Sequence, residues 1–172
     1  RMTYKEKLHK INTFIFDVDG VFTDGSVYLL QDEFVRVLNS RDGYAVQYAA
    51  RKGYNLFAIT GGSSLEVQKR LIGLGMKEVF LGASNKLKVY QDLKLQEGFS
   101  DEEVLYMGDD IPDFQVIQEV GVGCTPKDAA TEVLAVADYI SPYPGGRHCV
   151  RDVIEQTLRL QGKWMDFDAV EW

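Results

Sequence analysis

The feature that most constrains the fold is a series of short apolar runs, each of which stops abruptly at polar or glycine residues. These runs lie at 13–16, 54–59, 79–81 and 104–107, and amphipathic patterns typical of helices follow at 43–51, 65–74, 86–97 and 114–120. Alternating strands and helices predict an α/β protein, a Rossmann-like three-layer sandwich with a mainly parallel sheet covered on both faces. Ligands of such sheets bind outside the carboxyl ends of the strands.

Two segments depart from this alternation. Apolar runs at 26–30 and 34–38 are joined by three polar residues, which predicts a projecting β-hairpin over about 22–38. After a last helix at 150–160, residues 163–172 form a tail whose role the sequence leaves open. A chain of 172 residues suits one hydrophobic core, so we expect a single domain over 1–172.

Charge and cysteine content exclude several classes of partner. The formal net charge of -7 argues against nucleic acid, whose binding relies on clustered Lys and Arg. The cysteines, Cys124 and Cys149, have neither zinc-ligand spacing nor the pattern of a disulfide framework, so a reducing cytoplasm is expected. The first ten residues lack the apolar core of a signal peptide, and no apolar run is long enough to cross a membrane.

Polar side chains gather at the predicted strand ends. They are Asp17, Asp19, Thr60, Lys86, Asp109, Asp110 and Asp113. Each one alone is typical of a helix cap or a solvated loop, but carboxylates crowded at one sheet edge repel each other, which favours a bound cation. Oxygen ligands without nearby His or Cys suit Mg²⁺, which commonly combines carboxylates with water and substrate phosphate. The cluster therefore predicts magnesium-dependent phosphoryl chemistry.

The order of these residues resembles the four motifs of the haloacid dehalogenase superfamily phosphatases. The matching segments are Asp17-Val18-Asp19-Gly20-Val21, Thr60-Gly61, Lys86 and Gly108-Asp109-Asp110. The resemblance implies that Asp17 is the nucleophile that becomes phosphorylated and that Asp19 acts as general acid and then base. It implies Mg²⁺ bound by the side chains of Asp17 and Asp109 and by the backbone carbonyl of Asp19.

The remaining motif residues have implied roles around the phosphate. Thr60, Gly61 and Lys86 are expected to hold the phosphoryl oxygens and balance their charge. Asp110 and Asp113 could bind the metal through water, orient Lys86 or cap the helix that follows Pro112, and the sequence does not choose between these roles.

Neither gap between motifs has room for the cap domain that many members insert. Over residues 14–163 the chain is similar to a capless family within the superfamily, the 3-deoxy-D-manno-octulosonate 8-phosphate phosphatases. Three segments carry this similarity, at 17–25, 39–44 and 144–147 with 150–152. It implies hydrolysis of the eight-carbon sugar acid phosphate, in lipopolysaccharide precursor synthesis, by a homotetramer whose neighbouring subunits complete the active sites.

The same resemblance implies that Arg41, Asp42 and Arg147 bind the substrate. A guanidinium suits a sugar carboxylate because it offers paired donors to a planar anion. The alternatives are an exposed loop charge at Arg41 and, at Arg147, a cation over the ring of Tyr143. Gly62 stands where the family usually has Arg, so a nine-carbon sugar acid 9-phosphate remains the alternative substrate.

Other readings of the same residues remain to be tested. A phosphorylatable receiver module also joins clustered Asp, Thr and Lys, but its acid pair precedes the phosphoacceptor strand. A nonenzymatic oligomerising or regulatory module would keep the scaffold without turnover, which the intact Asp17, Asp19, Lys86 and Asp109 argue against. The apolar hairpin is a candidate subunit interface, unless it folds back onto its own sheet.

Overall fold

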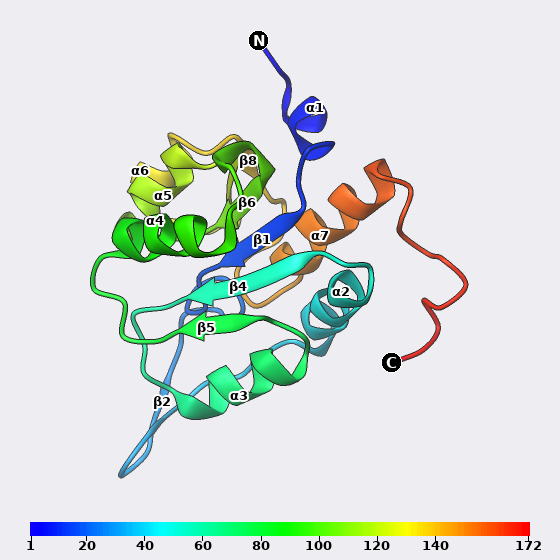
Figure 1. Cartoon of the computed structure of the whole chain (residues 1–172). Helices are drawn as coiled ribbons and strands as arrows, with labels where there is room; N and C mark the ends of the chain where they lie inside the picture. Colours follow the sequence, from blue (N-terminus) through cyan, green and yellow to red (C-terminus); the bar gives the residue numbers. More distant parts are fainter.

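A six-stranded parallel sheet forms the centre of the molecule (Figure 1). The computed structural model describes residues 1–172. In spatial order the strands are β5 (Glu78–Phe80), β4 (Asn55–Ile59), β1 (Thr13–Phe16), β6 (Val104–Met107), β7 (Val122–Thr125) and β8 (Tyr139–Ile140). Every neighbouring pair is parallel. The first strand therefore lies between β4 and β6, and its carboxyl end is flanked by theirs.

Helices cover both faces of the sheet and complete the predicted three-layer sandwich. One face carries α1 (Tyr4–Leu8), α2 (Ser40–Arg51), α3 (Leu65–Gly73) and α7 (Cys149–Leu160). The other carries α4 (Lys86–Glu97), α5 (Phe114–Glu119) and α6 (Thr131–Leu134). Two short 3-10 helices, η1 (Asp101–Glu103) and η2 (Ile111–Asp113), lie on either side of β6 in the sequence.

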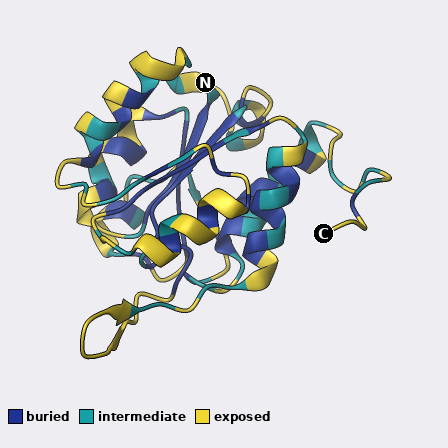
Figure 2. Ribbon diagram, turned by 60° about the horizontal axis from the view of Figure 1, so that its bottom comes forward, coloured by how far each residue is buried: buried dark blue, intermediate teal, exposed yellow.

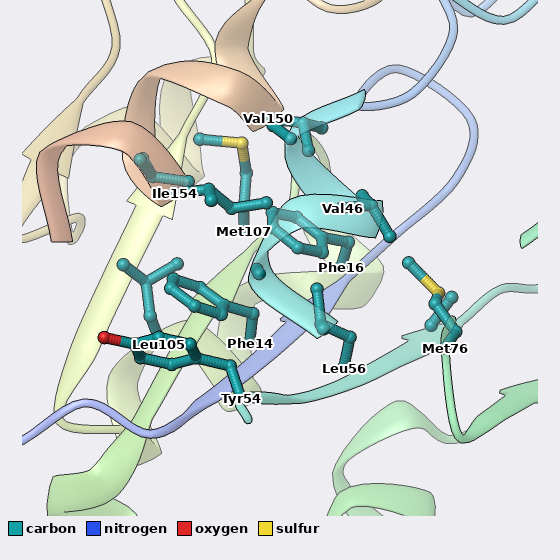
Figure 3. Close-up of a cluster of buried hydrophobic side chains, with 14 of the residues drawn as sticks. Phe14, Phe16, Val46, Tyr54, Leu56, Met76, Leu105, Met107, Val150 and Ile154 are labelled. Carbon is teal, nitrogen blue, oxygen red and sulfur yellow. The ribbon is translucent and has the colours of Figure 1, made fainter. Parts of the chain in front are cut away.

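Alternate side chains of each central strand enter the two hydrophobic layers. Along β1, Phe14 and Phe16 join the larger buried cluster, on the α2 and α7 side, whereas Ile15 joins the smaller one. Along β6, Leu105 and Tyr106 divide in the same way. Figure 3 shows part of the larger cluster, with side chains from the sheet meeting those of α2 and α7. The sequences of the strands are continuous apolar runs because both faces of the sheet are buried.

Polar caps fix where the long helices begin. Asn39 caps α2, Ser64 caps α3 and Asn85 caps α4, and each side chain accepts a hydrogen bond from a backbone N–H of the first turn. Because Asn85 starts α4, Lys86 is the first residue of that helix and lies at its sheet-edge end. The capping position thus decides where this lysine stands.

The predicted strands and main helices are confirmed with shifts of a few residues at their ends. The structure adds elements that the sequence did not predict: the short α-helices α1 and α6, the short strands β7 and β8, and the 3-10 helices η1 and η2. Each is five residues or shorter, so its periodicity is too brief to recognise. The α/β sandwich has no inserted cap domain, because β1 and β4 are joined only by the hairpin and α2, and β4 and β5 only by α3.

The hairpin projects away from the sheet, as predicted, but its paired strands are shorter than the apolar runs. They are β2 (Tyr28–Leu29) and β3 (Phe34–Val35), paired antiparallel. Figures 1 and 2 show this hairpin extending from the body of the protein with its tip exposed. Leu29 is 73% exposed and Phe34 61%, so the hairpin does not fold back onto its own sheet.

The tail packs against α2 of its own chain. The hydroxyl of Tyr44 donates to the carbonyl of Ala169, and Arg51 donates to the carbonyls of Asp168 and Glu171. The Nζ atom of Lys52 lies 3.0 Å from the Asp168 carboxylate. These contacts place the tail against α2 within its own chain.

None of the helices combines the length and apolar character that a membrane crossing needs.

Replacing Phe14 with alanine should destabilise the fold far more than the same change at Phe167. The Phe14 side chain is fully buried, whereas Phe167 is 96% exposed. The core change should lower the free energy of unfolding by about 3–5 kcal/mol, because transfer free energy and packing are both lost. The tail change should alter it by about 0.5 kcal/mol or less. Equilibrium unfolding in urea measures both, and equal losses would contradict this placement of the core.

Candidate active site

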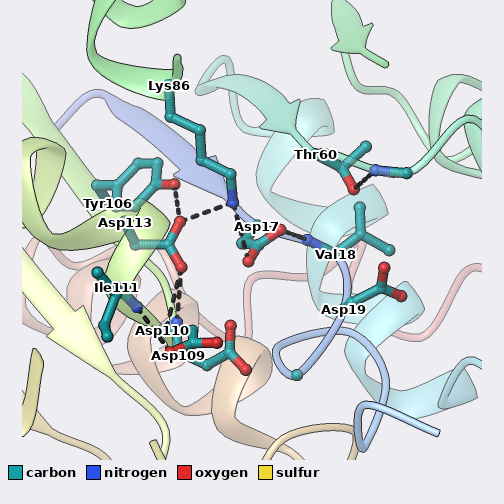
Figure 4. Close-up of polar contacts among 12 residues, drawn as sticks. Asp17, Val18, Asp19, Thr60, Lys86, Tyr106, Asp109, Asp110, Ile111 and Asp113 are labelled. Atoms are coloured by element: carbon teal, nitrogen blue, oxygen red, sulfur yellow. Dashed lines mark hydrogen bonds and ion pairs between the residues drawn. The ribbon is translucent and has the colours of Figure 1, made fainter. Parts of the chain in front are cut away.

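Three strand ends bring the predicted site residues to one edge of the sheet. Asp17 directly follows β1, Thr60 follows β4, and Asp109 comes one residue after Gly108 at the end of β6. Backbone bonds hold the loops in line with the strands: the N–H of Asp17 donates to the carbonyl of Met107. Figure 4 shows Asp17 between the other groups, with Asp109 and Asp113 to one side and Thr60 and Asp19 to the other.

Lys86 is the cation at the centre of this cluster. Its Nζ atom lies 3.0 Å from Asp17 Oδ2 and 2.8 Å from Asp113 Oδ1. All three side chains are buried, with exposures of 9% or less. An ammonium removed from water is stable only when opposite charges surround it, and here two carboxylates do so. Lys86 is therefore fixed beside Asp17 rather than solvated.

Asp113 orients Lys86, which is one of the roles that the sequence left open. Its Oδ1 also accepts a hydrogen bond from the hydroxyl of Tyr106, while Oδ2 accepts the backbone N–H groups of Asp109 at 3.0 Å and Asp110 at 3.2 Å. Both oxygens are thus fully engaged. A side chain at Gly108 would collide with this carboxylate, since a Cβ there would lie 2.2 Å from Asp113 Cγ.

Burial and mutual repulsion raise the pKa values of the acids that face the centre. Desolvation, followed by the charge of Asp113, raises the pKa of Asp17 well above its usual range despite the opposing effect of Lys86. The same two causes raise the pKa of Asp109 to about 6. Burial alone would lower the pKa of Lys86, but the charges of Asp17 and Asp113 outweigh it and raise that pKa. The site holds more negative charge than its lysine balances.

The carboxylates are close enough to share a cation. One oxygen from each of Asp17, Asp109 and Asp113 lies within 4.8 Å of the others. Because the oxygens of Asp113 already accept four hydrogen bonds, Asp17 and Asp109 are the pair best able to bind a metal directly. The donor set is oxygen alone, which fits a hard divalent ion such as Mg²⁺.

The loop after Asp17 requires glycine where it passes Asp109. Gly20 has a φ of +83°, and a Cβ there would lie 1.8 Å from Asp109 Oδ2. Gly145 in turn packs on this loop, because a Cβ at that position would lie 2.0 Å from the Gly20 carbonyl oxygen. Gly145, in the similar segment 144–147, therefore approaches the loop that follows Asp17 within this chain.

Asp19 turns away from the metal-binding pair and forms an ion pair that the sequence did not predict. Arg36 Nε lies 2.6 Å from Asp19 Oδ1, and Nη2 lies 3.1 Å from Oδ2. Thr60, on the same side of Asp17, is buried, and its hydroxyl accepts the N–H of Gly62 at 3.1 Å. Arg36 was missed because it lies in the apolar run of the hairpin, between the motif segments and in none of them.

Asp110 and Asp42 have structural positions in this chain. Asp110 is exposed, and its side chain accepts the N–H of Ile111 to cap η2, which contains Pro112, rather than the helix α5 that follows it. Asp42 is fully buried, where its oxygens accept the N–H groups of His148 and Arg151 at the start of α7. The expectation that Asp42 faces the substrate therefore has no support in this geometry: its carboxylate caps a helix.

Arg41 and Arg147 are exposed and lie in different cavities. Arg41 lines one of about 560 Å³ together with Tyr143 and Arg151. Arg147 lines another beside the base of the hairpin, and His148 borders both. Neither arginine forms an ion pair with the carboxylate cluster of this chain. The structure therefore does not join them to the site within one subunit.

Comparisons with known proteins agree with this geometry. Residues 72–154 match the family model of haloacid dehalogenase-like hydrolases. The chain is 36% identical over 158 residues to the 3-deoxy-D-manno-octulosonate 8-phosphate phosphatase KdsC of Escherichia coli K12, which spans 91% of this chain and 84% of that protein. The chain belongs to the haloacid dehalogenase-like hydrolase family. The resemblance read from the motifs is thereby confirmed.

Solved structures support the same family. A probable YrbI family phosphatase from Pseudomonas syringae has a TM-score of 0.91 and 33% identity, covering 94% of this chain and 92% of its own. The 3-deoxy-D-manno-octulosonate 8-phosphate phosphatase of Moraxella catarrhalis, solved with magnesium, phosphate and the sugar acid, has a TM-score of 0.89 and 31% identity, with 92% of each chain covered. These similarities confirm the capless α/β fold of the family.

The metal-free protein should lose stability as the pH rises from 3.8 through about 6. Because the folded-state pKa of Asp109 is raised, the folded protein holds that proton more tightly than the unfolded chain, and this advantage disappears as the pH passes the folded-state value. A divalent ion can take the place of the proton, so Mg²⁺ should stabilise the protein more above about pH 7 than below about pH 5.

Thermal unfolding midpoints with EDTA or Mg²⁺ across this range test the expectation. Asp109→Asn should flatten the pH dependence, whereas Asp92→Asn, at an exposed position on α4, should leave it unchanged. A stability profile that rises with pH in EDTA would contradict the electrostatic account.

Proposed function

We propose that this chain is a magnesium-dependent phosphatase that converts 3-deoxy-D-manno-octulosonate 8-phosphate to 3-deoxy-D-manno-octulosonate and phosphate. The observation that carries this proposal is the buried Asp17–Lys86 contact beside Asp109, in a protein whose relatives are named for this reaction. The proposed setting is lipopolysaccharide precursor synthesis in the cytoplasm, and the unpaired buried Cys124 and Cys149 suit a reducing compartment.

Asp17, Asp109 and the backbone carbonyl of Asp19 are the proposed ligands of Mg²⁺. The oxygen-only donor set and the excess negative charge support this assignment. When bound, the ion neutralises charge on the carboxylates and on the phosphoryl oxygens. Asp113 and Asp110 support the site from outside: Asp113 fixes Lys86, and Asp110 caps the short helix that carries Asp113.

Asp17 is the proposed nucleophile. A carboxylate oxygen attacks phosphorus, the bond from phosphorus to the sugar oxygen breaks, and Asp19 donates a proton to that oxygen. Water then attacks the phosphoaspartate, Asp19 takes its proton, and inorganic phosphate leaves as the Asp17 carboxylate is restored. Splitting one displacement into two steps lowers the barrier. The burial of Asp17 in contact with Lys86 limits competing solvation of the attacking oxygen.

The phosphoryl group is held by the loop at the end of β4. The Thr60 hydroxyl and the backbone amides at Gly61 are the proposed donors, with Lys86 as the counter-charge on the other side. These donors act on charge that develops during transfer, and because the fold fixes them they need no reorganisation at that moment. The phosphate is therefore proposed to lie between the loop after β4 and Lys86, two parts of the chain that the sheet and α4 hold in place.

Arg41 and Arg147 are proposed to bind the sugar acid in an assembly. Both guanidinium groups are exposed and neither forms a salt bridge within this chain, although the charge of Arg147 acts on Asp24, so their donors remain available. A homotetramer would bring such groups to the site of a neighbouring subunit, and this capless chain supplies no other cover for it. Asp42 would contribute indirectly, by capping the helix that follows Arg147.

The phosphatase assignment makes a sharp prediction for Asp17→Asn. The amide cannot serve as the attacking carboxylate, so phosphate release from 3-deoxy-D-manno-octulosonate 8-phosphate should fall at least about a thousandfold. EDTA should abolish the parent's activity, and added Mg²⁺ should restore it. Asp92→Asn, with the same chemical change on the exposed face of α4, should keep the parent's rate.

Four outcomes separate the alternatives. Equal activity in Asp17→Asn would reject the nucleophile, and activity indifferent to chelation would reject the metal site. A parent protein that releases no phosphate from either sugar acid would favour a nonenzymatic module. Gly62 keeps the nine-carbon 2-keto-3-deoxy sugar acid 9-phosphate as a second candidate, and faster release from that compound would replace the eight-carbon substrate.

The hairpin should be a subunit interface in the proposed homotetramer. Its apolar side chains are unusually exposed, with Leu29 at 73%, and a patch of this kind is costly to leave in water. Leu29→Asp should therefore dissociate the assembly and lower activity, as measured by sedimentation velocity and phosphate release. Leu95→Asp, at an 81% exposed leucine of α4, should change neither. A monomeric parent protein would contradict the proposed tetramer.

A further inference from the structure

Arg36 points inward from a hairpin that otherwise faces solvent. Its side chain is only 9% exposed, whereas the nearby Phe34 is 61% exposed and Val37 66%. Its guanidinium holds both oxygens of Asp19 through two donors, at 2.6 and 3.1 Å. The hairpin therefore delivers one buried cation to the edge of the candidate active site.

The guanidinium of Arg36 lies near the Thr60 hydroxyl because residue 62 is a glycine and has no side chain. A Cβ at Gly62 would lie 3.0 Å from Arg36 Nη2 and 3.5 Å from Thr60 Oγ1. One small void is bordered by Val18, Thr60, Gly62 and Arg36 together. Any larger residue at 62 would press on the arginine, so glycine leaves the space in which the guanidinium lies.

The contact with Asp19 is of a kind that a phosphate can replace. The hydrogen bonds that Arg36 donates to Asp19 raise the pKa of the guanidinium further, so it stays charged. Its paired donors fit a phosphoryl group as well as they fit a carboxylate. A phosphate monoester carries more charge than one carboxylate, and Thr60, one of the residues proposed to bind it, lies on the same side of Asp17 as Asp19.

We propose that Arg36 is a substrate-binding residue that leaves Asp19 and pairs with the phosphoryl oxygens when substrate enters. The exchange releases both oxygens of Asp19, which can then face the oxygen of the departing sugar. The inference rests on the proposed phosphatase function and adds a residue that none of its motifs contains. It also gives the hairpin a part in the chemistry of its own subunit, apart from any role between subunits.

A simpler role for Arg36 would be to fasten the hairpin to the sheet edge. Both roles predict that removing the guanidinium loosens the hairpin. Only the substrate-binding role predicts a loss of affinity for inorganic phosphate, because a tether does not touch the ligand. The binding of phosphate itself therefore separates the two.

The experiment is isothermal titration calorimetry of the Mg²⁺-loaded parent protein and its variants with inorganic phosphate. Arg36→Gln should weaken phosphate binding about tenfold or more, since a charge-assisted contact is lost. Arg36→Lys keeps the charge without the paired donors, so its affinity for phosphate should lie between those of the parent protein and Arg36→Gln. Arg159→Gln, an equal charge change on the exposed surface of α7, should bind phosphate as the parent does. In the phosphatase assay, Arg36→Gln should raise KM.

Two results would count against this inference in distinguishable ways. If Arg36→Gln binds phosphate within about twofold of the parent and keeps its KM, Arg36 is a tether and the inference is overturned. If Arg36→Gln does not fold, Arg36→Lys decides by the same comparison. A parent protein that neither binds phosphate nor hydrolyses the ester would instead overturn the proposed function on which the inference rests.

Discussion

The contact of Lys86 with Asp17 and Asp113 is the constraint on which the candidate site depends. It joins the end of β1, the start of α4 and the short helix after β6, three places that are distant in sequence. Without the lysine, the negative charges of the buried carboxylates would have no opposite charge nearby. The free energy of burying each uncompensated charge is several kcal/mol. One lysine still leaves an excess of negative charge, and burial followed by the charge of Asp113 raises the pKa of Asp109 to about 6. The fold therefore supplies a site that is completed by a divalent cation.

The two aspartates of the first motif have separate environments, which suits their separate proposed roles. Asp17 is buried and touches Lys86, whereas Asp19 lies on the hairpin side and pairs with Arg36. A nucleophile has to stay ionised and fixed, while an acid has to reach the leaving group and exchange a proton with it. Only Val18 separates the two aspartates along the chain. Both lie in the loop after β1, but Asp17 contacts Lys86 and Asp19 contacts Arg36.

Much of the fold and the centre of the site could be predicted from the sequence, because strand ends in a parallel sheet share one edge. That rule predicts Asp17, Lys86 and Asp109 at one edge, and one oxygen of Asp17 does lie within 4.8 Å of one oxygen of Asp109. Short elements such as β7 escaped prediction because Gly123 interrupts a run of only four residues. Arg36 escaped it for another reason: a charge within an apolar hairpin carries no sign of which distant carboxylate it will meet. The same holds for Asp42, whose buried capping role depends on the packing of α2 against α7 and cannot be read from a motif.

The most direct test of the central claim is anomalous diffraction from crystals of this protein soaked in Mn²⁺ as a substitute for Mg²⁺. The account predicts a single strong peak between the carboxylates of Asp17 and Asp109, at a coordination distance of about 2.0–2.3 Å from an oxygen of each. Lys86 should remain in contact with Asp113 in that structure. A peak elsewhere, or none at saturating Mn²⁺, would show that these loops do not form a metal site and would contradict the account.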